Sequence, residues 1–254
     1  MHLKKESTPP DLIFSNRALR LLIIPLMIEQ FLAITIGMAD SMMVSNVGEA
    51  AISGVNLVDS INNFLISMFS ALATGGTVVV SQYLGHKEKE NAIGAAKQLL
   101  LSVTAVSLFI MCLTLVGNRT ILGWIYQSVE ESVMENACVY FFLSALSYPF
   151  LAIYNSGAAL FRAQGNSKVS MYTAMVVNIV NICLNALLIY GFQLGVAGAG
   201  IATLIARASA AIVVTILLRK KTNEICVRDV LKIRPHFGTI RRILHIGVPT
   251  GLET

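Results

Sequence analysis

The chain has 254 residues, of which 55% are apolar and only 13% are charged, and its mean hydropathy is +0.70. Soluble domains carry about 25% charged residues, so this composition excludes an ordinary water-soluble protein and predicts a surface that mostly faces lipid. The net charge of +5 is explained by membrane topology, so no nucleic-acid partner is expected.

Six long apolar segments follow one another along the chain, at residues 17–45, 52–83, 93–117, 134–161, 170–191 and 195–218. A helix needs about 20 apolar residues to cross a bilayer, and each segment reaches that length. The segments are continuously apolar, whereas a barrel strand would be about ten residues of alternating polarity. The sequence therefore predicts an all-α polytopic membrane protein built as a bundle of six transmembrane helices.

The distribution of basic residues predicts the orientation of this bundle. With the N-terminus placed in the cytoplasm, 17 of the 19 Lys and Arg residues fall at the inside, while Arg119 falls outside and Arg207 lies within the sixth segment. By the positive-inside rule, this bias places both ends of the chain on the cytoplasmic side of the cell membrane.

The chain ends in a partial copy of its own first apolar segment. Residues 241–254, RRILHIGVPTGLET, match residues 17–30, RALRLLIIPLMIEQ, at a constant offset of 224 that aligns Pro249 with Pro25. Because six crossings are an even number, a second copy would enter the membrane from the same side as the first. Such copies are parallel repeats, and the sequence predicts that this chain is one of two in a twelve-helix transporter.

The repeat and the charge pattern together divide the chain into four expected parts. They are a cytoplasmic tail at 1–16, a six-helix transmembrane lobe at 17–218, a cytoplasmic inter-lobe linker at 219–241 and the truncated start of a seventh helix at 242–254. The last part is too short to cross a bilayer, and we expect it either to be disordered or to lie at the cytoplasmic surface.

The first segment carries two carboxylates that lipid would not tolerate. Glu29 and Asp40 are eleven residues apart, which places them on nearly the same helix face. Asp40 either faces a cavity or partner inside the bundle or lies in water at the outer helix end. Pro25 removes a backbone donor, so a kink is expected there.

Amide side chains cluster on the second and fifth segments. Asn178, Asn181 and Asn185 follow the spacing i, i+3, i+7, which is one helix face. They are explained equally well by hydrogen bonds between helices and by a polar cavity. Asp59 and Asn62 in the second segment either line a cavity for a cationic substrate or mark an exposed outer helix end, and we assign Glu29 and Asn178 to the same candidate cavity.

At these residues the chain resembles the multidrug and toxic compound extrusion (MATE) family over its whole length. The similar stretches are MADSMMVSNVGEAAISGVN after Pro25, then GGTVVVSQYLGHKEKENA, FRAQGNSKVSM and NIVNICLNALLIYGFQLGVAGAGIAT. Family members have two six-helix lobes and export organic cations against Na⁺ or H⁺. The resemblance therefore implies an ion-coupled antiporter, not an enzyme, of which this chain is the N-terminal half and the missing C-terminal lobe is the partner.

The resemblance also implies a set of cation-coupling residues, namely Asp40, Asn181, Asn185 and Thr203. Asn185 stands where the family has a second carboxylate, which leaves Asp40 alone to hold charge or a proton. Carboxylate, amide and hydroxyl oxygens suit a hard cation, so Asp40, Asn181 and Thr203 are candidate Na⁺ ligands. No cofactor is expected other than the coupling ion, Na⁺ or H⁺. The family's kink proline falls on Pro25.

Three alternatives remain open from the sequence. A lipid-linked precursor flippase of the same superfamily would carry a strongly basic central cavity, whereas here a single interior arginine, Arg207, stands against three interior carboxylates. A non-transporting membrane fragment is favoured by the missing second lobe. A homodimer could form if a second copy took the place of that lobe about a two-fold axis along the membrane normal.

The predicted topology can be tested by cysteine labelling. Cysteines introduced at Ser45 and at Lys87, in a background without the four native cysteines, should react with a membrane-impermeant maleimide from opposite sides, because an odd number of crossings separates them. Equal labelling of both positions from outside would contradict the topology.

Overall fold

The computed structural model describes residues 16–220, 225–227 and 236–252. The helices are α1 (Asn16–Ser45), α2 (Glu49–Gly85), α3 (Lys89–Ile125), α4 (Glu131–Ala163), α5 (Ser167–Asn185) with a π-helical extension (Ala186–Gly191), α6 (Gly195–Leu218) and α7 (Phe237–Leu252). Six of them are long and apolar enough to cross a membrane, which confirms the predicted six-helix bundle. Residues 1–15 of the expected tail, and 221–224 and 228–235 of the expected linker, lie outside the described residues.

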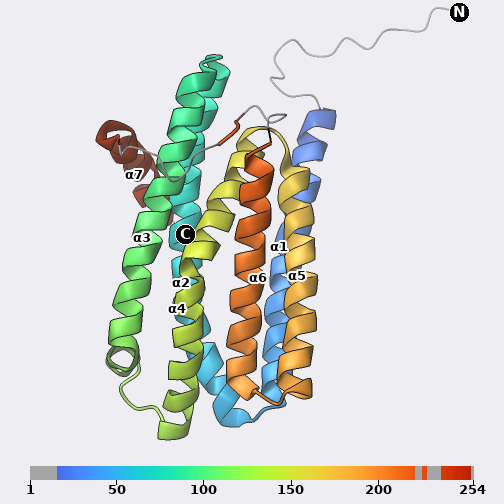
Figure 1. Cartoon of the computed structure of the whole chain (residues 1–254), viewed down its shortest axis with the longest axis vertical. Coiled ribbons are helices and arrows are strands. Elements are labelled where there is room, and N and C mark those ends of the chain that lie inside the picture. The colour runs from blue at the N-terminus through green and yellow to red at the C-terminus, as the bar shows by residue number, and fades with distance from the viewer. Residues whose placement is uncertain (1–15, 221–224, 228–235, 253–254) are drawn as a thin grey trace, which may run out of the picture.

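The six long helices run antiparallel to their chain neighbours and stand side by side (Figure 1). We call the end that carries the α2–α3 and α4–α5 turns the inner end, because it carries the predicted cytoplasmic loops, and the opposite end the outer end. Helix α4 is central and packs against α2, α3 and α6, whereas α1 packs mainly on α5. Helix α1 is therefore the least enclosed element of the bundle.

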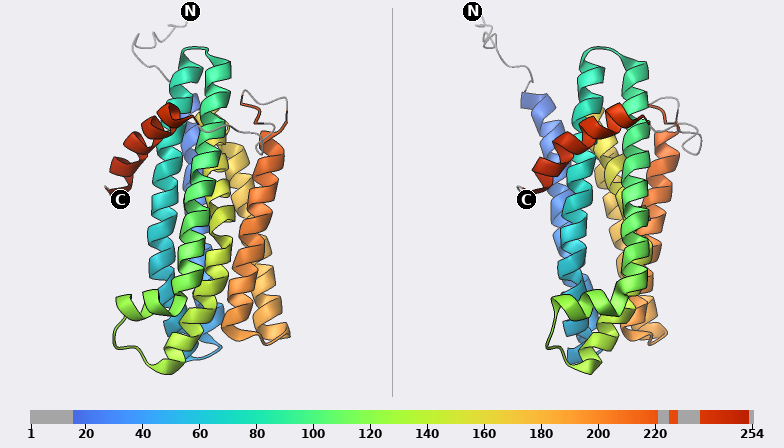
Figure 2. Two further views of the ribbon diagram at one scale, coloured as in Figure 1. Left: turned by 60° about the vertical axis from the view of Figure 1, so that its left-hand side comes forward. Right: turned by 90° about the vertical axis from the view of Figure 1, so that its left-hand side faces the viewer.

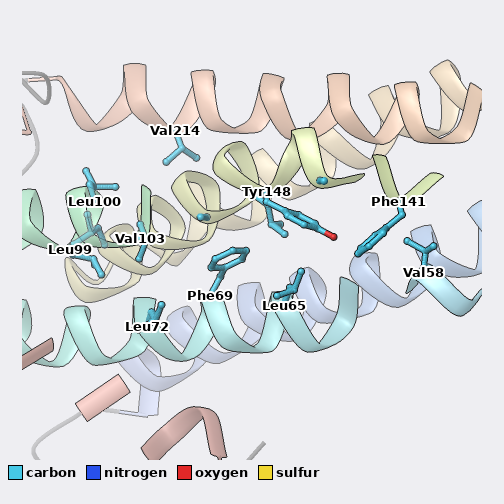
Figure 3. Close-up of a cluster of buried hydrophobic side chains, with 14 of the residues drawn as sticks. Val58, Leu65, Phe69, Leu72, Leu99, Leu100, Val103, Phe141, Tyr148 and Val214 are labelled. Atoms are coloured by element: carbon cyan, nitrogen blue, oxygen red, sulfur yellow. The ribbon is translucent and has the colours of Figure 1, made fainter. Parts of the chain in front are cut away.

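The core lies between α2, α3, α4 and α6 (Figure 3). Phe69 of α2 and Phe141 and Tyr148 of α4 are among its largest fully buried side chains, and Leu99 of α3 and Val214 of α6 close the cluster. Lipid is as apolar as these side chains, so close packing and hydrogen bonds hold such a bundle together more than the hydrophobic effect does.

Two helix crossings depend on glycine. A Cβ atom at Gly54 of α2 would lie 2.8 Å from the Val133 carbonyl oxygen and 2.9 Å from the Ala137 amide nitrogen of α4. A Cβ atom at Gly157 of α4 would lie 2.0 Å from Val214 Cγ1 of α6. Small residues are what allow transmembrane helix backbones to approach this closely, so these glycines set the position of α4 between its neighbours.

Helix α7 crosses the inner ends of α2 and α3 (Figure 2). It is joined to α2 by close contact of two glycine backbones, because a Cβ at Gly75 would lie 2.6 Å from the Gly247 amide nitrogen. Ile243 is fully buried in this contact, and Arg242 Nη2 donates to Gln82 Oε1 at 2.9 Å.

The expected boundary of this last segment at 242 is wrong. The helix begins at Phe237, because the His236 carbonyl oxygen accepts the first helical hydrogen bonds, from the amides of Thr239 and Ile240. The repeat aligns only from residue 241, so the sequence match set the start too late. The described part of 242–254 is also helical and packed, so the alternative of disorder is wrong for those residues.

The glycine crossing of α2 and α4 can be tested by adding one methyl group. Gly54→Ala should lower stability by about 1–3 kcal/mol, because the new Cβ meets backbone atoms that cannot rotate away. Gly94→Ala in α3 is the matched control, since a Cβ there meets nothing within 4 Å. The measurement is the thermal unfolding midpoint of the detergent-purified chain. Equal midpoints for the two variants would contradict the crossing.

Candidate functional site

A chain of polar side chains joins α1, α5 and α6 in the outer half of the bundle. Asn185 Nδ2 donates to Asp40 Oδ1 across α1 and α5, and also to Asn181 Oδ1 at 3.0 Å. Asn181 Nδ2 donates in turn to Thr203 Oγ1 of α6 at 3.5 Å. Both asparagines and Thr203 are buried. Asp40 therefore contacts the interior of the bundle, five residues before α1 ends.

A second group of polar side chains joins α2 to α4. Asn62 is 3% exposed, and its Nδ2 donates to Asp59 Oδ1 at 3.2 Å and to Ser144 Oγ at 3.4 Å. The Tyr148 hydroxyl donates to Asn62 Oδ1 at 3.0 Å. Each polar atom of this buried amide thus has a partner, as buried polar groups require.

Tyr140 of α4 connects the two groups. Its hydroxyl is within hydrogen-bonding reach of the Asp59 carboxylate and of the Thr203 hydroxyl, and its side chain is buried. The polar residues of five helices therefore form one continuous cluster, which we call the central cluster. Its members are Asp40, Asp59, Asn62, Tyr140, Ser144, Ser147, Tyr148, Asn181, Asn185, Thr203 and Arg207.

Arg207 brings the positive charge of the central cluster. Its Nη1 donates to Ser147 Oγ at 2.7 Å, and its charge acts on both Asp40 and Asp59. Among the described residues, neither carboxylate forms a salt bridge with it. The guanidinium is thus held by a hydroxyl of α4.

One buried oxygen of the central cluster is unsatisfied. Asn185 Oδ1 has no hydrogen-bond partner, although Nδ2 of the same side chain donates to both Asp40 and Asn181. In the part of the chain that the structure describes, no group of three or more His, Cys, Asp or Glu side chains could hold a metal ion. The oxygen atoms beside Asp40 are those of amides and hydroxyls, which suit a hard cation.

The helix geometry changes directly after this site. Residues 186–191 are π-helical, a form that is rare and is frequent at functional sites. Within it, the Tyr190 hydroxyl accepts a hydrogen bond from Asn46 Nδ2 at 3.0 Å, which ties the outer end of α5 to the turn after α1. The change in helix type follows Asn185, where the chain must both present an amide to Asp40 and turn toward α6.

Glu29 lies in a different place from the central cluster, near the inner end. Its carboxylate accepts hydrogen bonds from Arg162 Nη1 of α4, at 3.2 and 3.4 Å, and from Ser170 Oγ of α5, at 2.9 Å. The side chains of Glu29 and Arg162 are 15% and 31% exposed. The pair therefore anchors the inner half of α1, four residues after Pro25, which lies inside the helix.

The outward face of α2 is mostly polar, although it also exposes Phe64 and Val78. Its exposed residues include Asn56, Ser60, Asn63, Ser67, Ser70, Thr74, Ser81 and Gln82. Many of the exposed side chains of α1, α3, α5 and α6 are large and apolar, for example Phe31, Phe109, Val176 and Ile212. At its inner half this polar face borders a groove of about 540 Å³ between α2 and α4, where Arg162 also lies. Contact of these exposed hydroxyl and amide groups with lipid would be unfavourable, because lipid offers them no hydrogen bonds.

The structure brings together most, but not all, of the residues singled out from the sequence. Asp40, Asp59, Asn62, Asn181, Asn185 and Thr203 meet in the central cluster. Glu29 is held at the inner end, and Asn178 is half-buried outside the hydrogen-bonded chain. The sequence reasoning missed the hydroxyls of α4, although Tyr140, Ser144 and Tyr148 follow the spacing i, i+4, i+8 of one helix face.

A model of the MatE family matches residues 25–187 of the chain. The chain is 30% identical to an uncharacterized transporter, YisQ, of Bacillus subtilis, over 90% of this chain and 50% of that protein. It is 24% identical to a probable multidrug resistance protein, NorM, of Thermotoga maritima, over 99% of this chain and 53% of that protein. The chain thus spans about half the length of the curated relatives it matches.

Solved structures share the fold at lower sequence identity. An outward-facing multidrug resistance MATE family transporter superposes with a TM-score of 0.85 at 22% identity, over 93% of this chain and 52% of that one. An inward-facing structure of such a transporter gives 0.79 at 22% identity, over 92% and 53%. The helices of this chain therefore match about half of each of these solved structures.

The anchoring of α1 by Glu29 can be tested by removing one charge. Glu29→Gln should lower stability by roughly 1–3 kcal/mol, between the values for exposed and fully buried ion pairs. Glu131→Gln is the matched control, because the side chains of Glu131 and its partner Arg119 are 66% and 64% exposed. An exposed pair contributes little to stability, so this variant should lose less than Glu29→Gln. Thermal unfolding in detergent measures both. A smaller loss for Glu29→Gln than for Glu131→Gln would contradict the anchor.

Proposed function

Since the chain belongs to the MATE family, we propose that it forms the N-terminal lobe of an exporter that couples the outward movement of organic cations to the inward movement of Na⁺ or H⁺. The observation that carries this proposal is the central cluster, in which Asp40 is bound to Asn185 inside a membrane-spanning bundle. An ionisable side chain in such a place is costly, and it is typical of ion and substrate pathways.

The chemistry of the cluster supports a hard cation or a proton as the coupling ion. Asp40 supplies a carboxylate, Thr203 a hydroxyl, and Asn181 and Asn185 supply amides, of which Asn185 Oδ1 is buried without a partner. Oxygen ligands of this kind bind hard cations. Asn185 cannot take up a proton, so Asp40 would have to carry the proton if H⁺ is the coupling ion. The ion is here a transported substrate, not a resident cofactor.

The polar face of α2 supports a transport pathway on this side of the lobe. It carries hydroxyl and amide groups from Asn56 to Gln82 and belongs to the same helix as Asp59. A second lobe facing α1 and α2 would enclose this face in a cleft. Alternating access would then arise as the two lobes rock about the cleft. We place the inner end at the cytoplasm, in line with the basic residues of its turns.

The charges at the inner groove favour cationic over anionic cargo. A flippase for a lipid-linked precursor would need several unpaired basic groups to hold a diphosphate. Here Arg162, a basic residue that borders the groove, pairs with Glu29. The relatives named multidrug resistance and multidrug export proteins agree with a drug-like cation as substrate.

The role of Asp40 can be tested in the complete transporter that contains this lobe. Asp40→Asn should abolish ion-driven export, because it removes the charge that would bind the coupling ion, while membrane insertion stays intact. Efflux of a fluorescent organic cation from cells that lack other exporters is the measurement, with protein level in the membrane as the control. Asn185→Asp should instead change the ion dependence of export, since it adds a second titrating group. Full export by Asp40→Asn would refute the proposal.

A further inference from the structure

The groove between α2 and α4 lies in the inner half of the lobe, where an exporter would take up its cargo. Its volume of about 540 Å³ is within the range of small-molecule sites. Its polar lining residues are Thr74, Thr77, Ser81 and Gln82 of α2 and Arg162 of α4, and among the described residues that line it only Arg162 is charged. The charge that a ligand meets in this groove therefore depends on Arg162 and on what pairs with it.

Two threonines of α2 offer hydrogen-bond acceptors to the groove. Thr74 Oγ1 donates to the Ser70 carbonyl oxygen, and Thr77 Oγ1 donates to the Thr74 carbonyl oxygen, both at 2.9 Å. Because each hydroxyl hydrogen is used within the helix, the lone pairs of the two hydroxyl oxygens remain for a ligand. Acceptors of this kind suit a cationic ligand, whereas an unpaired guanidinium beside them would repel it.

Arg162 is paired by residues that lie behind the groove. Its Nη1 donates to the two carboxylate oxygens of Glu29 of α1, at 3.2 and 3.4 Å, and to Ser170 Oγ of α5, at 3.1 Å. Ser170 Oγ donates in turn to Glu29 Oε2 at 2.9 Å. The side chain of Arg162 is 31% exposed and that of Glu29 is 15% exposed, so the guanidinium is the more accessible member of the pair. Glu29 thus compensates the charge of the groove without lining it.

We propose that Glu29 determines the charge specificity of the inner groove, because it neutralises Arg162 and so allows an organic cation to bind there. This inference rests on the proposed function and names a residue that selects cargo at the inner end, away from the central cluster. An uncompensated unit charge about 6 Å away changes the affinity for a monovalent ligand about threefold even at the dielectric constant of water. The change is larger for a ligand with two charges.

The test uses two fluorescent dyes that share a ring system, ethidium with one positive charge and propidium with two. Export of ethidium by the complete transporter is measured in inverted membrane vesicles at pH 8, at ethidium concentrations well below its KM, with propidium as competitor. Glu29→Gln leaves Arg162 unpaired and should raise the half-inhibitory concentration of propidium at least about threefold. Arg162→Gln leaves Glu29 unpaired and should lower it at least about threefold.

The two single variants separate charge from structure, because both break the same ion pair. A purely structural role of the pair would change propidium inhibition in the same direction in both variants, whereas a charge role changes it in opposite directions. The double variant Glu29→Gln/Arg162→Gln lacks the pair but has an uncharged groove, so it should return to the wild-type value. Glu131→Gln, which breaks the exposed pair with Arg119, is the control and should inhibit as the wild type does.

The inference is overturned if the two single variants change in the same direction, if either keeps the wild-type value, or if the double variant behaves like one of the single variants. Should Glu29→Gln not reach the membrane, Arg162→Gln and the double variant still make the comparison. If the wild-type transporter exports no ethidium, the proposed function fails instead. That outcome is separate, because the fluorescence of propidium bound to the detergent-purified wild type and variants still tests the charge of the groove.

Discussion

A carboxylate inside a lipid-facing bundle must find its polar partners within the protein, because the bilayer core offers none. The contact between Asp40 and Asn185 meets this requirement, and it is also one of the few strong links between α1 and the rest of the lobe. Helix α1 has large apolar side chains exposed along most of its length. It is held mainly by α5, by the Glu29–Arg162 pair at the inner end and by the Asp40 contact at the outer end. The residue that would bind the ion is therefore also a residue that holds the helix.

Under the proposed function, this double role would give a physical route from ion binding to movement. A cation bound by the Asp40 carboxylate would compete with the Asn185 amide for the same oxygen atoms. Binding would then change the contact that fastens α1 to α5, and the hydrogen bonds of the central cluster would connect this change to α4 and α6. The polar face of α2 belongs to the helix that carries Asp59. Helix α2 therefore carries both Asp59, a residue of the central cluster, and the polar face that would line the proposed pathway.

The sequence was sufficient for the number and order of the spanning helices, which depend on local runs of apolar residues. Six apolar segments predicted six spanning helices, because the length needed to cross lipid can be read along the chain. The structure extends several of them at their polar ends, as for α3, predicted at 93–117 and observed from Lys89 to Ile125. Polar helix ends that project beyond the apolar segment leave no hydropathy signal. The start of α7 was set too late for a similar reason, since the repeat does not cover its first turn.

The sequence by itself determined the helices, and it singled out Asp40, Asn181 and Asn185 as polar residues that lipid would not tolerate. Only the tertiary structure decided which of those residues share a site. It joined Asp59 to the cluster through the hydroxyls of α4, and it gave Glu29 a partner 133 residues away. It also brought Arg207 of α6 into contact with Ser147 of α4. The spacing of residues on one helix fixes which face they share, but which faces meet depends on close crossings such as the one at Gly54, and these exist only once the helices have packed.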